Sequence, residues 1–205
     1  PAPRIWKRPR FITETPVNFR RYDYFFGDIA LNYSNTRVLV TGADGFIGSH
    51  LVEQLQSLGA DVTALAQYNS FDTCGWLDEL PARTRQDLRI ERGDVRDKAY
   101  MLELAKGQEI IFHLAALIAI PYSYVAAQSY VDVNVHGTLN LLEAVRGGDI
   151  GRMVHTSTSE VYGSAQTRPI SEAHALHGQS PYAASKIGAD QMAEAYARSH
   201  DVPVV

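Results

Sequence analysis

A tyrosine and a lysine in the second half of the chain have the spacing of a proton-transfer pair. Tyr182 and Lys186 lie four residues apart, so on a helix their side chains share one face. A lysine cation one turn away favours the phenolate, which makes a phenol a useful base at neutral pH. Thr158 is placed to hold the same substrate hydroxyl. The pattern indicates deprotonation of a substrate hydroxyl, whereas on a surface helix it usually gives only a solvated pair.

Two predicted elements position these side chains. Residues 152–156 are typical of a strand that ends in the hydroxyl-rich run 156–160. Ser180 and Pro181 are typical of the N-cap and the first residue of a helix over residues 181–199. Side chains at the carboxyl end of a parallel strand emerge above the cofactor crevice of an α/β sheet. We therefore expect the strand end and the helix to border one crevice.

A glycine-rich stretch near residue 40 predicts where a cofactor binds. The apolar run 38–40 is typical of a strand buried on both faces, and Gly42, Gly45 and Gly48 follow it at three-residue spacing. The first glycine permits a tight turn, the second lets the backbone approach a pyrophosphate, and the third lets the next helix pack on the strand. The dipole of that helix favours the anion. A plain strand–helix turn is the alternative, but the flanking strand and helix favour dinucleotide binding.

From residue 37 onward, predicted strands and helices alternate, which favours a parallel sheet. The fold class is therefore α/β, a doubly wound parallel sheet of the Rossmann type, in an NAD(P)-binding domain over residues 36–205. The expected strands cover residues 38–40, 61–66, 88–91, 109–114 and 152–156, with a sixth beginning at 202–205. The expected helices cover residues 46–58, 97–106, 125–146 and 181–199.

The composition limits the classes of partner. The chain has 205 residues, 45% of them hydrophobic, and a net charge of -4, which gives nucleic-acid binding no support. No apolar run is long enough to span a membrane, and we expect no metal site. One cysteine, Cys74, forms no internal disulfide and suits a reducing, cytoplasmic location. Residues 1–35 form a basic, aromatic extension, for which packing on its own domain or a neighbouring subunit is favoured over RNA or membrane binding.

The acid expected at the ribose of the cofactor is not evident. Such an acid usually lies at the end of the second strand and accepts from the ribose 2′-hydroxyl. Asp61 lies at the start of that strand, whereas its end, at Ala66, Gln67 and Tyr68, holds neither an acid nor an arginine. The choice between NAD and NADP is therefore open from the sequence.

Two further polar residues follow the third expected strand, and a third lies within the fourth. Asp94 is a candidate acceptor for an adenine amino group, with a turn residue as the alternative, and Asp97 is a candidate helix N-cap. His113 lies in the apolar run 110–120, which favours a buried, hydrogen-bonded structural histidine over a catalytic one.

Over residues 37–205 the chain resembles the extended short-chain dehydrogenases/reductases, the NAD-dependent epimerase/dehydratase family. The motifs that carry the resemblance are Thr41-Gly-Ala-Asp-Gly-Phe-Ile-Gly48, Gly93-Asp-Val95, His113-Leu-Ala-Ala116, Asn134-Val-His-Gly-Thr138, Thr158-Ser-Glu-Val-Tyr-Gly163 and Tyr182 to Lys186. The resemblance implies a hydride-transfer centre at Thr158, Tyr182 and Lys186. It implies NAD, with NADP not excluded, bound by Gly42, Gly45, Phe46, Ile47, Gly48, Asp94, Val95, Leu114, Ala115, Ala116, Tyr182 and Lys186. It also implies a homodimer, paired through the helices near 125–146 and 181–199.

Glu160 narrows the implied reaction to a nucleotide-sugar 4,6-dehydratase. In that reaction Tyr182 takes the C4 hydroxyl proton as hydride passes to the cofactor, and the 4-ketone acidifies C5. Glu160 then removes the C5 proton as the C6 hydroxyl leaves, and hydride returns to C6. Ser159 stands where glucose-type enzymes carry an acid, which would make Glu160 both base and acid. A solvated loop carboxylate is the alternative for Glu160.

Three shorter stretches resemble dehydratases of legionaminic-acid-type pathways, which act on a nucleotide-linked N-acetylglucosamine. They are 68–71 with 75–78, 119–124 and 178–182. The residues that hold base and diphosphate lie mostly in the family's smaller C-terminal lobe, which we expect to be largely absent from this chain. A UDP-glucuronate decarboxylase, a 4-epimerase and a non-enzymatic dinucleotide sensor or scaffold remain alternatives.

Overall fold

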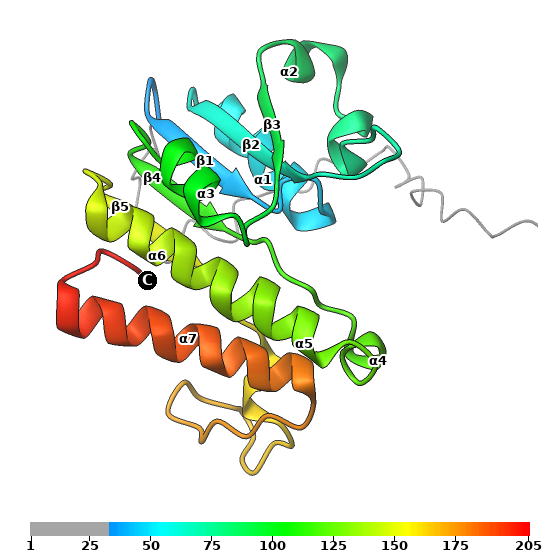
Figure 1. The fold of residues 1–205 in the computed structure, drawn as a ribbon, viewed down its shortest axis with the longest axis vertical. Coiled ribbons are helices and arrows are strands. Elements are labelled where there is room, and N and C mark those ends of the chain that lie inside the picture. Colours follow the sequence, from blue (N-terminus) through cyan, green and yellow to red (C-terminus); the bar gives the residue numbers. More distant parts are fainter. Residues whose placement is uncertain (1–32) are drawn as a thin grey trace, which may run out of the picture. The chain divides into compact units, whose positions relative to one another are not determined.

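The computed structural model describes residues 33–205, and the prediction for the extension over residues 1–35 lies almost entirely outside them. A parallel five-stranded sheet forms the centre of the described residues, in the order β3-β2-β1-β4-β5 (Figure 1). The strands are β1 Arg37–Thr41, β2 Asp61–Gln67, β3 Arg89–Gly93, β4 Ile110–His113 and β5 Arg152–His155. All five predicted strands are present, and the third begins and ends slightly later than expected.

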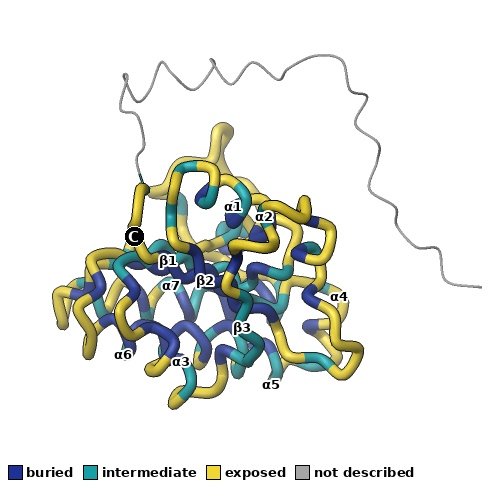
Figure 2. Tube along the Cα trace, turned by 90° about the horizontal axis from the view of Figure 1, so that it is seen from above, coloured by how far each residue is buried: buried dark blue, intermediate teal, exposed yellow. Residues whose placement is uncertain are grey.

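The strand order reverses beside β1, where a parallel sheet of this kind opens a ligand crevice. β1 pairs with β2 on one side and with β4 on the other, so that Val40 lies opposite both Ala64 and Phe112. Val38, Leu39 and Val40 have no exposed surface, as their unbroken apolar run predicted. Figure 2 shows these central strands as the buried interior of the domain.

Helices cover both faces of the sheet, which confirms the doubly wound class. On one face, α1 (Phe46–Ser57) and the 3-10 turn Gly75–Glu79 enclose a core with Val38, Val52 and Leu77. On the other face, α3 (Lys98–Leu104), α6 (Gly137–Gly147) and α7 (Pro181–His200) enclose a second core with Met101, Leu141 and Ala193. The remaining helices are α2 Ala82–Gln86, α4 Ile120–Ser123 and α5 Ala127–Tyr130.

The predicted helix over residues 125–146 is built from three consecutive pieces. α5 leads into a π-helical segment, Val131–His136, which leads into α6. A π-helical turn inside a helix often marks a functional site, because it displaces the side chains that follow. Asn134, within this segment, faces the interior and is buried.

The predicted beginning of a sixth strand lies alongside β5. Val204 forms an isolated parallel bridge with Met153 of β5, and the N–H of Met153 donates to the carbonyl of Pro203 at 2.8 Å. The N–H of His155 likewise donates to the carbonyl of Val205 at 2.8 Å, so residues 203–205 extend the five-stranded sheet of the described residues beyond β5. Within residues 33–205 no helix has the length and apolar character to cross a bilayer, and no three potential metal ligands gather.

Candidate functional site

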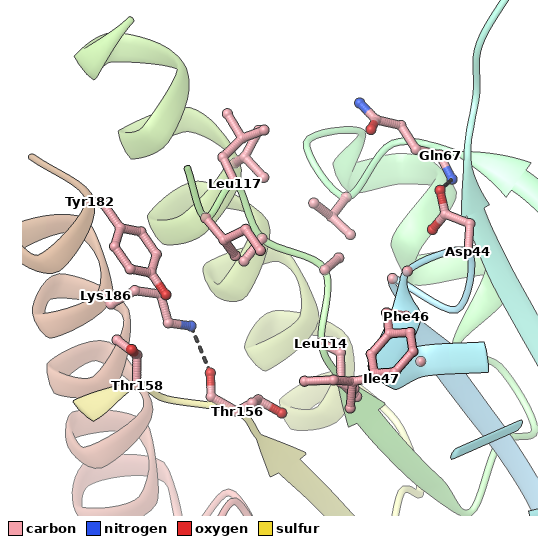
Figure 3. A pocket seen from close by; sticks show the side chains of 18 of the residues that line it. Asp44, Phe46, Ile47, Gln67, Leu114, Leu117, Thr156, Thr158, Tyr182 and Lys186 are labelled. Carbon is pink, nitrogen blue, oxygen red and sulfur yellow. Dashed lines mark hydrogen bonds between the residues drawn. The ribbon is translucent and has the colours of Figure 1, made fainter. Parts of the chain in front are cut away.

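A pocket of about 760 Å³ opens at the carboxyl ends of the strands, within the size range of small-molecule and cofactor sites. All the candidate site residues from the sequence lie in its wall. They are Gly42, Gly45, Phe46, Ile47, Gly48, Asp94, Val95, Leu114, Ala115, Ala116, Thr158, Glu160, Tyr182 and Lys186. The fold thus brings the glycine loop and the tyrosine–lysine pair, far apart in the sequence, to opposite walls of one cavity (Figure 3).

The glycine loop packs its backbone so closely that side chains do not fit at two of its glycines. Gly42 has φ +68, and a Cβ at this residue would lie 2.7 Å from the backbone nitrogen of Ala115. A Cβ at Gly48 would lie 2.1 Å from the carbonyl oxygen of Gly42. α1 begins at Phe46 with Gly45 as its N-cap, which has no side chain to satisfy the first N–H groups. These groups and the helix dipole fit the pyrophosphate of a dinucleotide.

The opposite wall combines the end of β5 with the start of α7. Tyr182 is 7% exposed and Lys186 is 5% exposed, and Figure 3 shows both side chains directed into the pocket. The Nζ of Lys186 donates a hydrogen bond to the carbonyl of Thr156, just beyond β5, at 2.7 Å. Burial lowers the pKa of Lys186, and the charge of Asp190 partly opposes this effect. Ser180 caps α7 by accepting from the N–H of Ala183, as predicted.

Thr158 and Glu160 come from the short turn after β5. The Oγ1 of Thr158 accepts a hydrogen bond from the N–H of Glu160 at 3.3 Å and caps the 3-10 turn Ser159–Tyr162. Glu160 is exposed and lines the pocket. The turn therefore places a hydroxyl and a carboxylate in the same cavity as Tyr182.

A second carboxylate lies one helical turn beyond Lys186. Asp190 accepts from Ser157 Oγ at 2.5 Å and pairs with His155 Nε2 at 2.9 Å. Burial alone would raise the pKa of Asp190, but these hydrogen bonds and the charges of His155 and Lys186 outweigh it and lower the pKa. Asp190 was not among the residues predicted from the sequence, although its spacing of four from Lys186 was the available signal.

His113 is the buried, hydrogen-bonded residue that the sequence predicted. It is 2% exposed, with Thr41 Oγ1 2.8 Å from Nδ1 and Thr138 Oγ1 3.0 Å from Nε2. Burial above all, and then the charges of His155 and Lys186, hold its pKa well below the usual value. In its neutral form, His113 of β4 therefore links β1 and α6 through hydrogen bonds.

Asn134 holds the segment that follows β4 against α7. Its side chain accepts from the N–H of Leu117 at 2.8 Å, and its Nδ2 donates to the carbonyl of Leu117 at 3.0 Å and to Ser185 Oγ at 2.9 Å. In the sequence, Asn134 stood out only as part of a family motif. Its role as a clamp depends on the π-helical turn, which the sequence analysis did not anticipate.

The acids after β3 have different functions. Asp97 caps α3 by accepting from the N–H of Tyr100, as expected. Asp94 lines the pocket, but both of its carboxylate oxygens accept from Arg96, which lowers the pKa of Asp94 against the opposing effect of burial. An adenine amino group that bound Asp94 would therefore share the carboxylate with Arg96.

The parallel sheet, the glycine loop at its switch point and the tyrosine–lysine wall define a nucleotide-binding domain of the Rossmann type. A family model described as GDP-mannose 4,6 dehydratase matches residues 39–205. The chain belongs to this family, a member of the NAD-dependent epimerases and dehydratases.

Relatives with solved or curated identities include both dehydratases and epimerases. A dTDP-glucose 4,6-dehydratase of Actinoplanes sp. is 39% identical over 176 residues, which cover 82% of this chain and 54% of the relative. The dTDP-glucose 4,6-dehydratase DesIV of Streptomyces venezuelae, solved with NAD bound, is 36% identical with a TM-score of 0.71, covering 82% of this chain and 54% of that chain. A UDP-N-acetylglucosamine 4-epimerase of Methanobrevibacter ruminantium is 30% identical with a TM-score of 0.76, covering 83% and 53%. The chain spans about half the length of these relatives.

Proposed function

We propose that this chain is the cofactor-binding half of a nucleotide-sugar 4,6-dehydratase. The observation that carries the proposal is the position of Glu160, which lines the same pocket as Tyr182, Lys186 and Thr158. A site that only oxidised and reduced C4 would need the tyrosine and lysine alone, whereas loss of water also needs a group that takes the C5 proton. The similarity to dTDP-glucose 4,6-dehydratases supports the same reaction.

The cofactor of the proposed enzyme is NAD, held by residues 36–205. The glycine loop and the N-terminus of α1 fit its pyrophosphate, because Gly45 leaves the first N–H groups of α1 without a side-chain cap. The rest of the cofactor would lie against Asp94, Val95 and the segment 114–116. When bound, the nicotinamide would supply reversible hydride acceptance.

Each residue of the opposite wall has a defined role in the proposal. Tyr182 takes the proton of the sugar C4 hydroxyl, with Thr158 binding the same oxygen. Lys186, held by its bond to the carbonyl of Thr156, provides the positive charge that favours the phenolate. Glu160 takes the C5 proton and gives a proton to the departing C6 hydroxyl, so that water leaves. Once hydride has returned to C6, a solvent-derived proton replaces the hydrogen at C5. The exposure of Glu160 to the cavity leaves it free to move between these positions.

We propose a nucleotide-linked N-acetylglucosamine as substrate, on the resemblance of three stretches to legionaminic-acid-type dehydratases. A structural relative that acts on UDP-N-acetylglucosamine supports this sugar. The same relative favours 4-epimerisation as the second candidate reaction. The two reactions differ in their product, because only dehydration removes the C6 hydroxyl.

The test uses the full-length protein with UDP- and GDP-N-acetylglucosamine in deuterated water. Loss of one water with deuterium at C5 is the expected result, and unchanged mass with inversion at C4 would establish an epimerase. Glu160→Gln should abolish water loss, while Glu172→Gln, an exposed acid outside the pocket, should leave it intact. Equal loss in both variants, or full activity of Glu160→Gln, would refute the role of Glu160.

We also propose a homodimer that pairs the long helices. α6 and α7 pack together, and Tyr196 donates a 2.6 Å hydrogen bond to Glu143 between them. The resemblance to the family supports pairing of these helices with their copies. Sedimentation of the full-length protein at the mass of one subunit would contradict this proposal.

A further inference from the structure

The glycine loop carries an acid that the sequence analysis did not connect with the cofactor. Asp44 lies between Gly42 and Gly45, and its Oδ2 accepts a hydrogen bond from the N–H of Gln67, the last residue of β2, at 3.2 Å. Asp44 and Gln67 both line the pocket, and Figure 3 shows them side by side. The end of the second strand is where folds of this kind bind the adenosine ribose.

We propose that Asp44 binds the ribose hydroxyls of the cofactor and makes the site selective for NAD over NADP. The acid reaches the ribose position from the glycine loop instead of from β2. This inference rests on the proposed function, because it assumes that a nicotinamide dinucleotide occupies the pocket.

A neighbouring turn fixes the backbone of Asp44. The carbonyl oxygen of Asp44 accepts a hydrogen bond from the N–H of Trp76 at 2.9 Å. Gly75 has φ +57, and a Cβ there would lie 2.4 Å from the same oxygen, so the turn can approach only because residue 75 is glycine. Trp76 also packs edge to face on Phe46, with ring centroids 5.3 Å apart. β2 thus holds the side chain and the turn holds the backbone, so the acid is in place before a ligand arrives.

The charges at this edge of the pocket oppose a 2′-phosphate. Among the described residues that line the pocket, Lys186 is the only lysine or arginine, and it belongs to the α7 wall. Arg92, paired with Ala66 near the end of β2, does not line the pocket. Its guanidinium binds Asp72 and donates to Cys74 Sγ at 3.2 Å. A 2′-phosphate would therefore meet the Asp44 carboxylate with no cation to offset the repulsion.

Binding of NAD⁺ and NADP⁺ to the full-length protein, freed of cofactor, tests the inference by titration calorimetry. The wild type should bind NAD⁺ roughly tenfold or more tightly than NADP⁺, because a like charge next to the 2′-phosphate costs at least this much. Asp44→Asn should reduce that ratio roughly tenfold, through tighter NADP⁺ and weaker NAD⁺ binding. Asp61→Asn removes an equal charge from the opposite end of β2 and should leave the ratio unchanged.

The outcomes separate this inference from the proposed function. A wild type that binds neither dinucleotide overturns both. NAD⁺ binding with an unchanged NAD⁺/NADP⁺ ratio in Asp44→Asn overturns the role of Asp44 and leaves the proposed function standing. If Asp44→Asn unfolds at a lower temperature than the wild type, Asp44→Ser replaces it, and an unchanged ratio there also overturns the inference.

Discussion

Replacing Gly48 by alanine should push α1 away from β1 and weaken cofactor binding. A Cβ at Gly48 would lie 2.1 Å from the carbonyl oxygen of Gly42 and 2.8 Å from the Cα of Ala43. Real Cβ atoms keep at least 3.0 Å from such neighbours, so the gap must open by about 0.9 Å. The obstructing atoms are backbone and cannot rotate away. α1 must therefore move relative to β1.

The energetic cost follows from the kind of clash. Overpacking a close-packed interior costs about 1–3 kcal/mol, and a backbone obstruction lies toward the upper end of that range. Alanine in place of glycine within a helix returns about 1 kcal/mol of helix propensity. The net loss in the free energy of unfolding is therefore about 2 kcal/mol, which corresponds to a fall in Tm of roughly 4–8 °C for a domain of this size. The displaced loop should also lose at least one charged hydrogen bond to the pyrophosphate, which weakens NAD⁺ binding roughly tenfold.

Thermal unfolding with and without NAD⁺ measures both effects, and Gly147→Ala is the matched control. Gly147 ends α6, and a Cβ there would meet nothing within 4 Å. Its replacement should leave NAD⁺ affinity unchanged and raise the free energy of unfolding by up to about 1 kcal/mol. A Gly48→Ala variant with wild-type Tm and wild-type NAD⁺ affinity would refute the reasoning.

Two further predictions concern titrating groups. Burial holds the pKa of His113 well below 6.5, so below pH 6.5 the unfolded chain binds a proton that the folded protein does not. The free energy of unfolding therefore falls as the pH drops from 6.5 toward the folded-state pKa, by about 1 kcal/mol between pH 6.5 and 5.5. Urea unfolding across this range should show that loss in the wild type and in the exposed His50→Gln control but not in His113→Gln, and equal slopes in all three would contradict it. Asp190 raises the pKa of Lys186, so Asp190→Asn should move the basic limb of the kcat/KM profile to lower pH. Ser157→Ala keeps the Asp190 charge and should move the basic limb less. If Asp190→Asn leaves the basic limb where it is in the wild type, the coupling between Asp190 and Lys186 is refuted.

Most of the fold was predictable because its signals are local. The unbroken apolar run of β1 and the glycines after it specify a buried strand and a tight turn without reference to the rest of the chain. Ser180 and Pro181 located the start of α7 in the same way. The beginning of a sixth strand at residues 202–205 was predictable as well, since Val204 forms a parallel bridge with Met153 and Val205 donates to the carbonyl of Met153 at 2.9 Å.

The site residues missed from the sequence all depend on contacts between distant segments. Asn134 acts through a π-helical turn and the carbonyl of Leu117, neither of which leaves a periodic signal. Asp190 acts through His155 and Ser157 of the β5 wall. A search for chemistry along single elements finds the tyrosine–lysine pair on α7, but it does not find groups that work across two elements.

Asp44 shows why the acid at the ribose could not be found by its usual position. A carboxylate at the end of β2 and one in the glycine loop lie at the same edge of the sheet, because parallel strands bring all their carboxyl ends to one edge, and here Asp44 contacts the last residue of β2. Only the loop conformation decides between them, and that conformation depends on Gly75 and the N–H of Trp76. The physical requirement is for a negative charge at that edge, not for a particular residue number. An acid inside the glycine spacing, together with a second strand that ends without one, is therefore a pattern that predicts preference for NAD.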